Sequence, residues 1–146
     1  MSSVEFVIPG PPQGKGRARS TRSGIHFTPK KTVLYENKVM TCFQEAADGW
    51  RPTEKPVSVE ITARFQIPVS ATKKSKLAMM LQKILPTKKP DIDNIVKAVF
   101  DGLNGVAWLD DKQIVKLVAE KIYPGEGEDA SVTVVVSEIV PEEEAI

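Results

Sequence analysis

The sequence is poor in the residues that make covalent or metal cross-links. Its 146 residues include one cysteine, Cys42, and one histidine, His26. A single cysteine cannot form an internal disulfide, and a lone histidine does not predict a zinc site. Cys42 also falls on the apolar stripe of an expected helix, which argues against a nucleophilic role. Neither a disulfide framework nor cysteine chemistry is therefore expected.

Long apolar runs are also lacking. No N-terminal stretch resembles a signal peptide, and none approaches the roughly 20 residues that cross a bilayer. We therefore expect a soluble protein of a reducing compartment, the cytoplasm, with no membrane role. The chain is long enough for one domain, residues 1–146, that buries about two thirds of its unfolded surface.

The net charge is only +1, but the charges are unevenly distributed along the chain. Two stretches are basic, and acids dominate the C-terminal end. The first stretch contains Lys15, Arg17, Arg19, Arg22, Lys30 and Lys31, and the second contains Lys73, Lys74, Lys76, Lys83, Lys88 and Lys89. Uneven charge bears on binding partners more than a total near zero does.

Hydrophobic periodicity predicts an α+β domain. The expected order is strand, helix, strand, helix, helix, strand, strand, with a mixed or antiparallel sheet flanked by helices. The last two strands are expected to be joined by the turn at 124–127. The segments are a strand at 4–8, helices at 29–48 and 77–84, a strand at 57–67, a helix from Asp91, and strands at 113–123 and 131–139.

Four acids carry the strongest chemical signal. Asp91 and Asp93 stand one residue apart, and Asp110 and Asp111 follow after one amphipathic helix. Carboxylates gathered in this way repel one another, and a fold that gathers them usually offsets the cost by binding a hard cation such as Mg²⁺. The pattern therefore favours metal-assisted phosphoryl chemistry.

Helix geometry limits how these acids can meet. Residues two apart on a regular helix diverge by about 200°, so Asp91 and Asp93 share a metal only if Asp91 is the N-cap, where its carboxylate is free to turn. The helix itself carries the chain about 20 Å away. We expect Gly102, Gly105 and the loop that follows to bring Asp110 or Asp111 back.

A purely structural interpretation stays open. Asp91 can serve only as a cap, and Asp93 can pair with Lys97 four residues later on the same face. Asp110 and Asp111 can form an ordinary turn. Alternatively, Lys97 holds Asp93 ionised or contacts a scissile phosphate.

The first basic stretch has two interpretations as well. The segment 14–19 alternates glycine with Lys15, Arg17 and Arg19, a composition suited to following DNA phosphates. It is equally typical of a mobile, solvated loop. Asn94 is either a donor to a phosphate or carboxylate or an ordinary residue of the first helical turn. An acidic metal site in the same chain favours nucleic acid as the partner.

Five segments together resemble the RusA family of Holliday-junction resolvases. They are the sequences at 89–97 (KPDIDNIVK), 100–104 (FDGLN), 108–114 (WLDDKQI), 10–17 (GPPQGKGR) and 26–29 (HFTP). The resemblance extends from about Val4 to Glu138. Some members have a basic residue directly before the first aspartate, where this chain has Pro90, so the phosphate contact is assigned to Lys89.

The resemblance implies a RusA-like fold and a dimeric endonuclease that uses Mg²⁺ to introduce paired nicks across four-way DNA junctions in recombination and repair. Mn²⁺ is expected to substitute, and such proteins are often encoded by prophages. Asp91, Asp93 and Asp111 are implied as metal ligands, with Lys97 essential beside them. The alternatives are a non-catalytic DNA-binding protein and a metal-dependent nuclease acting on other branched DNA or on RNA.

Overall fold

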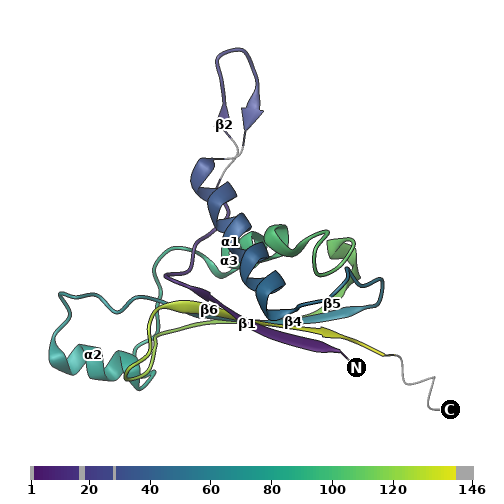
Figure 1. The fold of residues 1–146 in the computed structure, drawn as a ribbon. Helices are drawn as coiled ribbons and strands as arrows, with labels where there is room; N and C mark the ends of the chain where they lie inside the picture. Colours follow the sequence, from purple (N-terminus) through teal and green to yellow (C-terminus); the bar gives the residue numbers. More distant parts are fainter. Residues whose placement is uncertain (1, 17–18, 28, 141–146) are drawn as a thin grey trace.

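The computed structural model describes residues 2–16, 19–27 and 29–140, and its centre is a four-stranded sheet. The strand order is β1 (Ser3–Pro9), β6 (Ser131–Glu138), β4 (Val57–Arg64) and β5 (Ile114–Ile122). β6 pairs antiparallel with both β1 and β4, whereas β5 runs parallel to β4. The predicted α+β class with a mixed sheet is confirmed (Figure 1).

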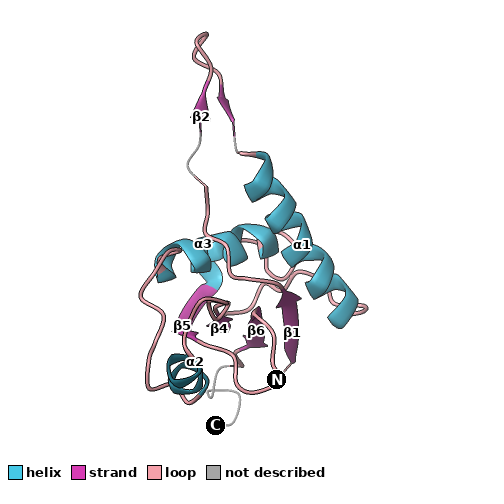
Figure 2. Cartoon of the chain, turned by 90° about the vertical axis from the view of Figure 1, so that its left-hand side faces the viewer, coloured by secondary structure: helices cyan, strands magenta, loops and turns pink. Residues whose placement is uncertain are grey.

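Two helices, α1 (Lys30–Ala46) and α3 (Ile92–Leu103), cover one face of this sheet. The short helix α2 (Lys73–Met80) lies apart from them, and a two-stranded hairpin of β2 (Arg19–Ser20) and β3 (His26–Phe27) projects from the opposite end of the molecule (Figure 2). A 3₁₀ turn, η1 (Asp111–Gln113), leads into β5. No helix among the described residues is long and apolar enough to cross a membrane.

The expected pairing of the last two strands is wrong. β5 and β6 belong to the same sheet, but β4 lies between them. β4 has side chains that pack on both neighbours: Ile61 is opposite Val134 of β6 and Ala119 of β5. The connection at 123–130 only has to cross two strand spacings, about 10 Å, so a glycine-rich segment that resembles a hairpin turn is long enough to pass over β4.

The core forms between the sheet and the two helices. Alternate residues of β4 are buried, as the period-two pattern predicts. α1 and α3 approach closely at Gly102, where a Cβ would lie 2.8 Å from the Cβ of Val39. Gly102 is a buried residue of the last turn of α3 and not part of the loop that follows. Its missing side chain lets α1 pack against α3.

The second predicted helix begins and ends about four residues earlier than expected, and Met79 is its contact with the core. α2 buries none of its residues, and Leu77 and Leu81 are 54% and 56% exposed. The helix ends at Met80 rather than at Pro86 because Gln82 has a left-handed backbone (φ 60°). The side-chain amide of Gln82 instead pairs with the backbone of Tyr123 on both its N–H and its C=O.

Candidate active site

The first two acids lie at the start of α3, as the sequence predicts. Asp91 is the N-cap, with extended backbone angles (φ −66°, ψ 152°), and its side chain makes no capping hydrogen bond. Asp93 is in the first turn, and both residues are exposed. None of the ion pairs among the described residues includes Asp91, Asp93 or Lys97. The structure therefore does not support the interpretation that these acids only cap and brace the helix.

Asp91 lines a recess of about 620 Å³, together with Gly14, Lys15, Lys89, Pro90 and Asn94. The N-terminal loop closes one side of this recess because the backbone N–H of Lys15 donates to the carbonyl of Asn94 at 3.1 Å. A Cβ on Gly14 would lie 3.0 Å from the Cβ atoms of both Asn94 and Pro90. Only glycine lets the loop lie this close to the acid-bearing end of α3.

Lys15 forms ion pairs with acids of both packed helices. Its Nζ lies 2.8 Å from Oε2 of Glu36 on α1 and 2.9 Å from Oδ2 of Asp101 on α3, and its side chain is 23% exposed. Burial alone lowers the pKa of Lys15, but its hydrogen bonds to Glu36 and Asp101 and their charges raise that pKa above its usual value. The ammonium group of Lys15 thus links α1 to α3, and its contact with DNA stays a prediction.

The other predicted DNA contacts occupy varied positions. Lys89 is exposed and lines the recess directly before Pro90. Asn94 lines the recess and is half-buried. Arg17 lies outside the described residues, and for Arg19 only the backbone, in β2, is described.

The second acidic pair lies in the turn before β5, where its two carboxylates have separate partners. Oδ1 of Asp111 accepts a hydrogen bond from Nε1 of Trp108 at 2.8 Å. Trp108 is fully buried and packs edge-on against Phe100, with ring centroids 5.7 Å apart. Oδ1 of Asp110 accepts from the backbone N–H of Lys112 at 3.2 Å and so caps η1. The indole of Trp108 therefore orients Asp111, whereas Asp110 mainly closes the turn.

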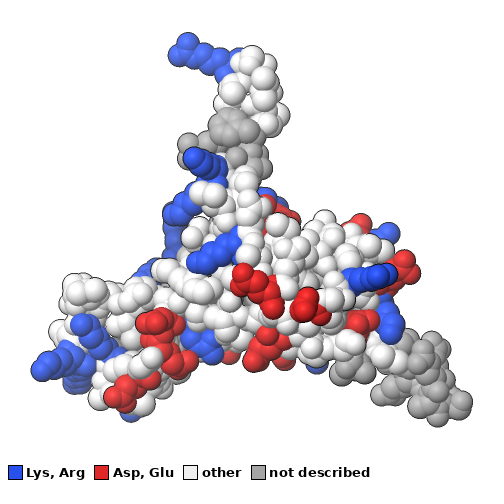
Figure 3. Space-filling view, in the orientation of Figure 1, with Lys and Arg blue, Asp and Glu red and all other residues white. Residues whose placement is uncertain are grey.

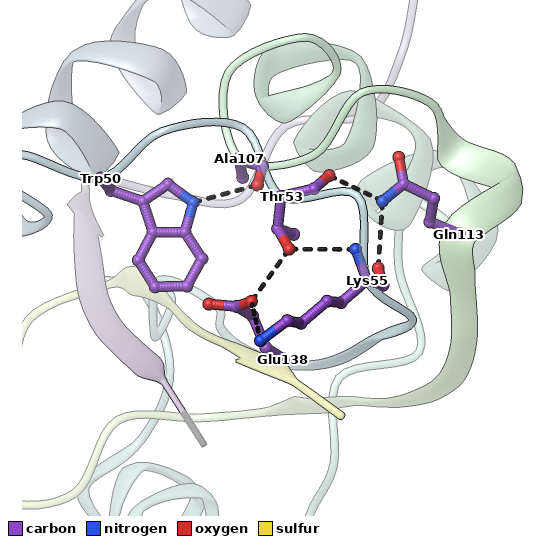
Figure 4. Close-up of polar contacts among 6 residues, drawn as sticks. All are labelled: Trp50, Thr53, Lys55, Ala107, Gln113 and Glu138. Atoms are coloured by element: carbon purple, nitrogen blue, oxygen red, sulfur yellow. Dashed lines mark hydrogen bonds and ion pairs between the residues drawn. The ribbon is translucent and has the colours of Figure 1, made fainter. Parts of the chain in front are cut away.

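Gln113 holds this turn against the segment that precedes β4. Its Oε1 accepts from the backbone N–H groups of Leu109 and Asp110, each at 2.9 Å. Its Nε2 donates to the carbonyls of Thr53 and Lys55 at 2.7 and 3.0 Å (Figure 4). One side chain thus satisfies four backbone groups, and the position of Asp111 depends on it.

The same network includes the end of β6. The hydroxyl of Thr53 donates to Oε2 of Glu138 at 2.9 Å, and Nε1 of Trp50 donates to the carbonyl of Ala107 at 3.0 Å (Figure 4). The turn is consequently attached to three separate segments of the chain. A rigid support of this kind suits a carboxylate that has to be held in one orientation.

The two acidic pairs do not meet within one chain. Asp111 contacts Trp108, which packs on Phe100 in the last turns of α3, so α3 separates it from Asp91 by roughly 15 Å. No group of three or more His, Cys, Asp or Glu side chains among the described residues is arranged to hold a metal. The expectation that the loop brings Asp111 back to Asp91 is wrong for a single chain.

Comparisons with known proteins agree with the motifs at both ends of α3. The model of the family described as Endodeoxyribonuclease RusA matches residues 9–136. The uncharacterized protein YqaN of Bacillus subtilis (strain 168) is 34% identical over 147 residues, which cover 95% of this chain and 99% of YqaN. The chain belongs to the RusA family of endodeoxyribonucleases.

As a RusA-family protein, the chain is a hydrolase that acts on DNA, and nucleases of this family generally depend on a divalent metal. The residues at the start of α3 fit such a metal in part. The carboxylates of Asp91 and Asp93 have no protein partner among the described residues, and oxygen is the donor that Mg²⁺ prefers. One chain of this RusA-family enzyme thus offers two candidate ligands together and a third at a distance.

Sequence reasoning about this RusA-family chain missed two supporting residues. The three-residue spacing of Asp110 and Gln113 is that of a capping box, a signal that was present in the sequence. The partnership of Lys15 with Asp101 had no local signal, because 86 residues separate them. Asp101 of α3 is thus an ion-pair partner of a residue in the N-terminal loop.

Proposed function

We propose that the protein is a Mg²⁺-dependent, structure-selective endodeoxyribonuclease that resolves four-way DNA junctions by paired symmetric nicks. The observation that carries this proposal is a pair of unpartnered carboxylates, Asp91 and Asp93, at the start of α3 in a RusA-family chain. Asp91 also lines the recess that contains Lys89. When bound to such oxygens, Mg²⁺ activates a water and stabilises charge on a phosphate. Lys97, exposed one turn beyond Asp93, adds a cation for the transition state.

We propose that the active form is a homodimer. Two symmetric cuts need two sites, and a two-fold dimer is the commonest closed assembly. The position of Asp111 supports a dimer independently. If Asp111 is a metal ligand together with Asp91 and Asp93, it has to come from a second copy, because the length of α3 separates it from them in one chain.

The β5 edge is the surface we propose for this contact. β5 is the last strand of the sheet, and its outer backbone groups have no strand partner among the described residues. Val115, Leu117 and Val118 of this strand are 63%, 43% and 47% exposed, so apolar side chains lie on both faces of the edge. An unprotected apolar edge is a template for pairing with another chain.

Antiparallel pairing of two β5 edges has a consequence for the acids. The end of β5 lies beside the segment that leads into Asp91, since Nζ of Lys121 donates to the carbonyl of Lys88 at 2.7 Å. The beginning of β5 directly follows Asp111 and η1. A two-fold axis across β5 therefore brings the Asp111 end of one copy towards the Asp91 end of the other.

The distribution of charge favours DNA on the helix-covered side. Lys and Arg side chains gather on the hairpin and on the side of the molecule below it, whereas those near α2 lie beside Asp and Glu side chains (Figure 3). The opposite, open face of the sheet includes Glu5, Glu60 and Glu120 around a shallow depression. A polyanion is repelled there, so we assign junction binding to the face that carries the start of α3.

One assay tests this function against its rivals. Purified protein is incubated with synthetic four-way, flap and linear DNA and with RNA, with and without Mg²⁺. We expect paired nicks in the four-way junction only when Mg²⁺ is present, and Mn²⁺ to replace it. Junction binding that is indifferent to Mg²⁺ and yields no nicks would instead identify a DNA-binding protein, and cutting confined to flaps or RNA would identify a different nuclease.

A further inference from the structure

A second cationic surface leads up to the recess and meets it at Lys89. Residues 73–89, here called the lysine arm, contain no acid and six lysines: Lys73, Lys74, Lys76, Lys83, Lys88 and Lys89. None of the ion pairs among the described residues includes any of these lysines. The arm therefore carries six positive charges that are in no ion pair among the described residues, although acidic side chains lie beside α2 (Figure 3).

The stability of α2 does not explain these lysines. Thr72 caps the helix by accepting from the backbone N–H of Ser75, so Lys73 and Lys74 are its first two residues. The first turn contains no acid. Cations at this end oppose the positive end of the helix dipole and weaken the helix. Their presence is better explained by an anionic partner than by folding.

Several contacts attach the arm to the rest of the molecule. Gln82 pairs with the backbone of Tyr123 through two hydrogen bonds, and the carbonyl of Lys88 accepts from Nζ of Lys121. Met79 packs against the core. These contacts fix the arm before any partner arrives, which lowers the entropic cost of binding.

The position of the arm relates it to the acids. The arm continues directly into Pro90 and Asp91. In both ribbon views the hairpin and α2 lie at opposite ends of the molecule, with α3 between them (Figures 1 and 2). A duplex that presents one phosphate to the start of α3 therefore has further phosphates within reach of the arm.

We infer that the lysine arm is a DNA-contact surface that binds the backbone of the duplex beside the cleaved phosphate. This inference rests on the proposed function, which supplies the DNA substrate. The arm contacts phosphates without reading bases, because lysine is a flexible point charge and α2 exposes no asparagine, glutamine or arginine for bidentate base contacts. It sets affinity and the path of the duplex, not the chemistry of cleavage.

A lipid surface fits this helix less well. A helix that lies on a membrane separates its apolar face from its cationic face. In α2, Leu77 lies between Lys73 and Lys74 around the helix axis, at about 40° from Lys73 and about 60° from Lys74. Cations and leucines therefore share one face, and the leucine cannot enter hydrocarbon without taking both ammonium groups with it.

The test compares two doubly substituted proteins of equal charge. Lys73→Gln with Lys74→Gln changes the arm, and Lys38→Gln with Arg51→Gln is the control. Both control residues are exposed, Lys38 on α1 and Arg51 in the loop after it, and neither lies on the proposed dimer edge. Binding to a labelled four-way junction is measured in EDTA, where no strand is cut, from about 0.05 to 0.3 M salt, a range over which phosphate contacts change affinity strongly.

We expect the arm variant to bind the junction about eightfold more weakly for each lost phosphate contact at 0.1 M salt. The slope of the logarithm of the binding constant against the logarithm of the salt concentration should be shallower by about 0.9 for each lost contact. The control variant keeps the wild-type slope. An arm variant with the wild-type slope and affinity overturns the inference, and so does a loss of binding to anionic phospholipid vesicles with DNA binding unchanged. Failure of the wild-type protein to nick junctions in Mg²⁺ overturns the proposed function instead. The salt dependence of binding is measured without cleavage, so it tests the arm separately from the nuclease activity.

Discussion

Nζ of Lys15 lies 2.9 Å from Oδ2 of Asp101, and the same ammonium reaches Glu36 at 2.8 Å. One lysine of the N-terminal loop thus joins α1 to α3. The loop it belongs to forms the wall of the recess beside Asp91, through Gly14 and the backbone of Lys15. The shape of the candidate active site therefore depends on an ion-pair network more than one helical turn away from its acids.

Replacing Lys15 with methionine should destabilise the protein by about 1–2 kcal/mol, a range reduced from that of buried ion pairs because the site is partly exposed. Glu36 and Asp101 would keep their charges but lose their common partner. Lys15→Arg, which retains a cation, should lose less. Urea unfolding of the three proteins measures the difference, and equal stability of wild type and Lys15→Met would show that the network contributes nothing.

The contribution of Lys15 should also depend on pH in a defined direction. Its pKa is raised in the folded state, so its stabilising effect is fully present below the unfolded pKa of lysine, about 10.4. The effect is lost as pH rises through the higher folded value. The stability gap between wild type and Lys15→Met should therefore stay constant from pH 6 to 9 and shrink only in strong alkali.

Asp93→Asn should abolish nicking and leave the fold intact. Since the carboxylate has no partner among the described residues, its loss should change stability by less than about 0.5 kcal/mol. Junction binding should persist or tighten, because one negative charge near the DNA is removed. Single-turnover cleavage and gel-shift binding measure the two effects, with Asp48→Asn as an exposed acidic control. Parental cutting by Asp93→Asn would refute the assignment.

Lys97→Ala should reduce turnover more than affinity. An exposed lysine with no ion pair among the described residues is free to stabilise charge that develops in the transition state. We expect a fall in the single-turnover rate of about a hundredfold or more, with junction affinity changed by less than tenfold. Lys97→Arg is the matched control, because it keeps the positive charge but changes the shape of the cationic group. A loss of affinity that accounts for the whole rate change would make Lys97 an ordinary phosphate contact.

Gln113→Ala should displace Asp111 as well as destabilise the chain. The substitution leaves four backbone groups without their side-chain partner. We expect a loss of about 1–3 kcal/mol in urea unfolding. At a temperature where the variant is fully folded, nicking should still fall below wild type, because the turn that carries Asp111 is loosened. Full activity of the folded variant would show that the turn needs no such support.

Local patterns predicted the local features correctly. The alternation in β4 and the cap position of Asp91 depend on residues within a few positions, so the sequence contains the information. Contacts between residues far apart in the sequence were harder to predict from it. Lys15 pairs with Asp101 across 86 residues, and nothing near Lys15 distinguishes a structural lysine from a DNA contact.

The return of Asp111 was predicted wrongly for a topological reason. β5 pairs parallel to β4, so its beginning lies at the end of the sheet far from the start of α3. The glycines after α3 permit a sharp return in principle, but Trp108 and Gln113 fix the turn where it is. Strand order and direction decided the outcome, and neither can be read from periodicity.

Mixing two inactive chains tests most directly whether the acids form one site shared between copies. Asp93→Asn and Asp111→Asn chains with different tags are co-expressed, and the heterodimer is purified and given four-way junctions with Mg²⁺. We predict that the heterodimer nicks one strand, because one of its two sites combines an intact Asp91 and Asp93 from one chain with an intact Asp111 from the other. Each homodimer should stay inactive. A heterodimer of the Asp93→Asn chain with a chain that carries both Asp93→Asn and Asp111→Asn should stay inactive as well. A mixed heterodimer as inactive as its parents would contradict the account.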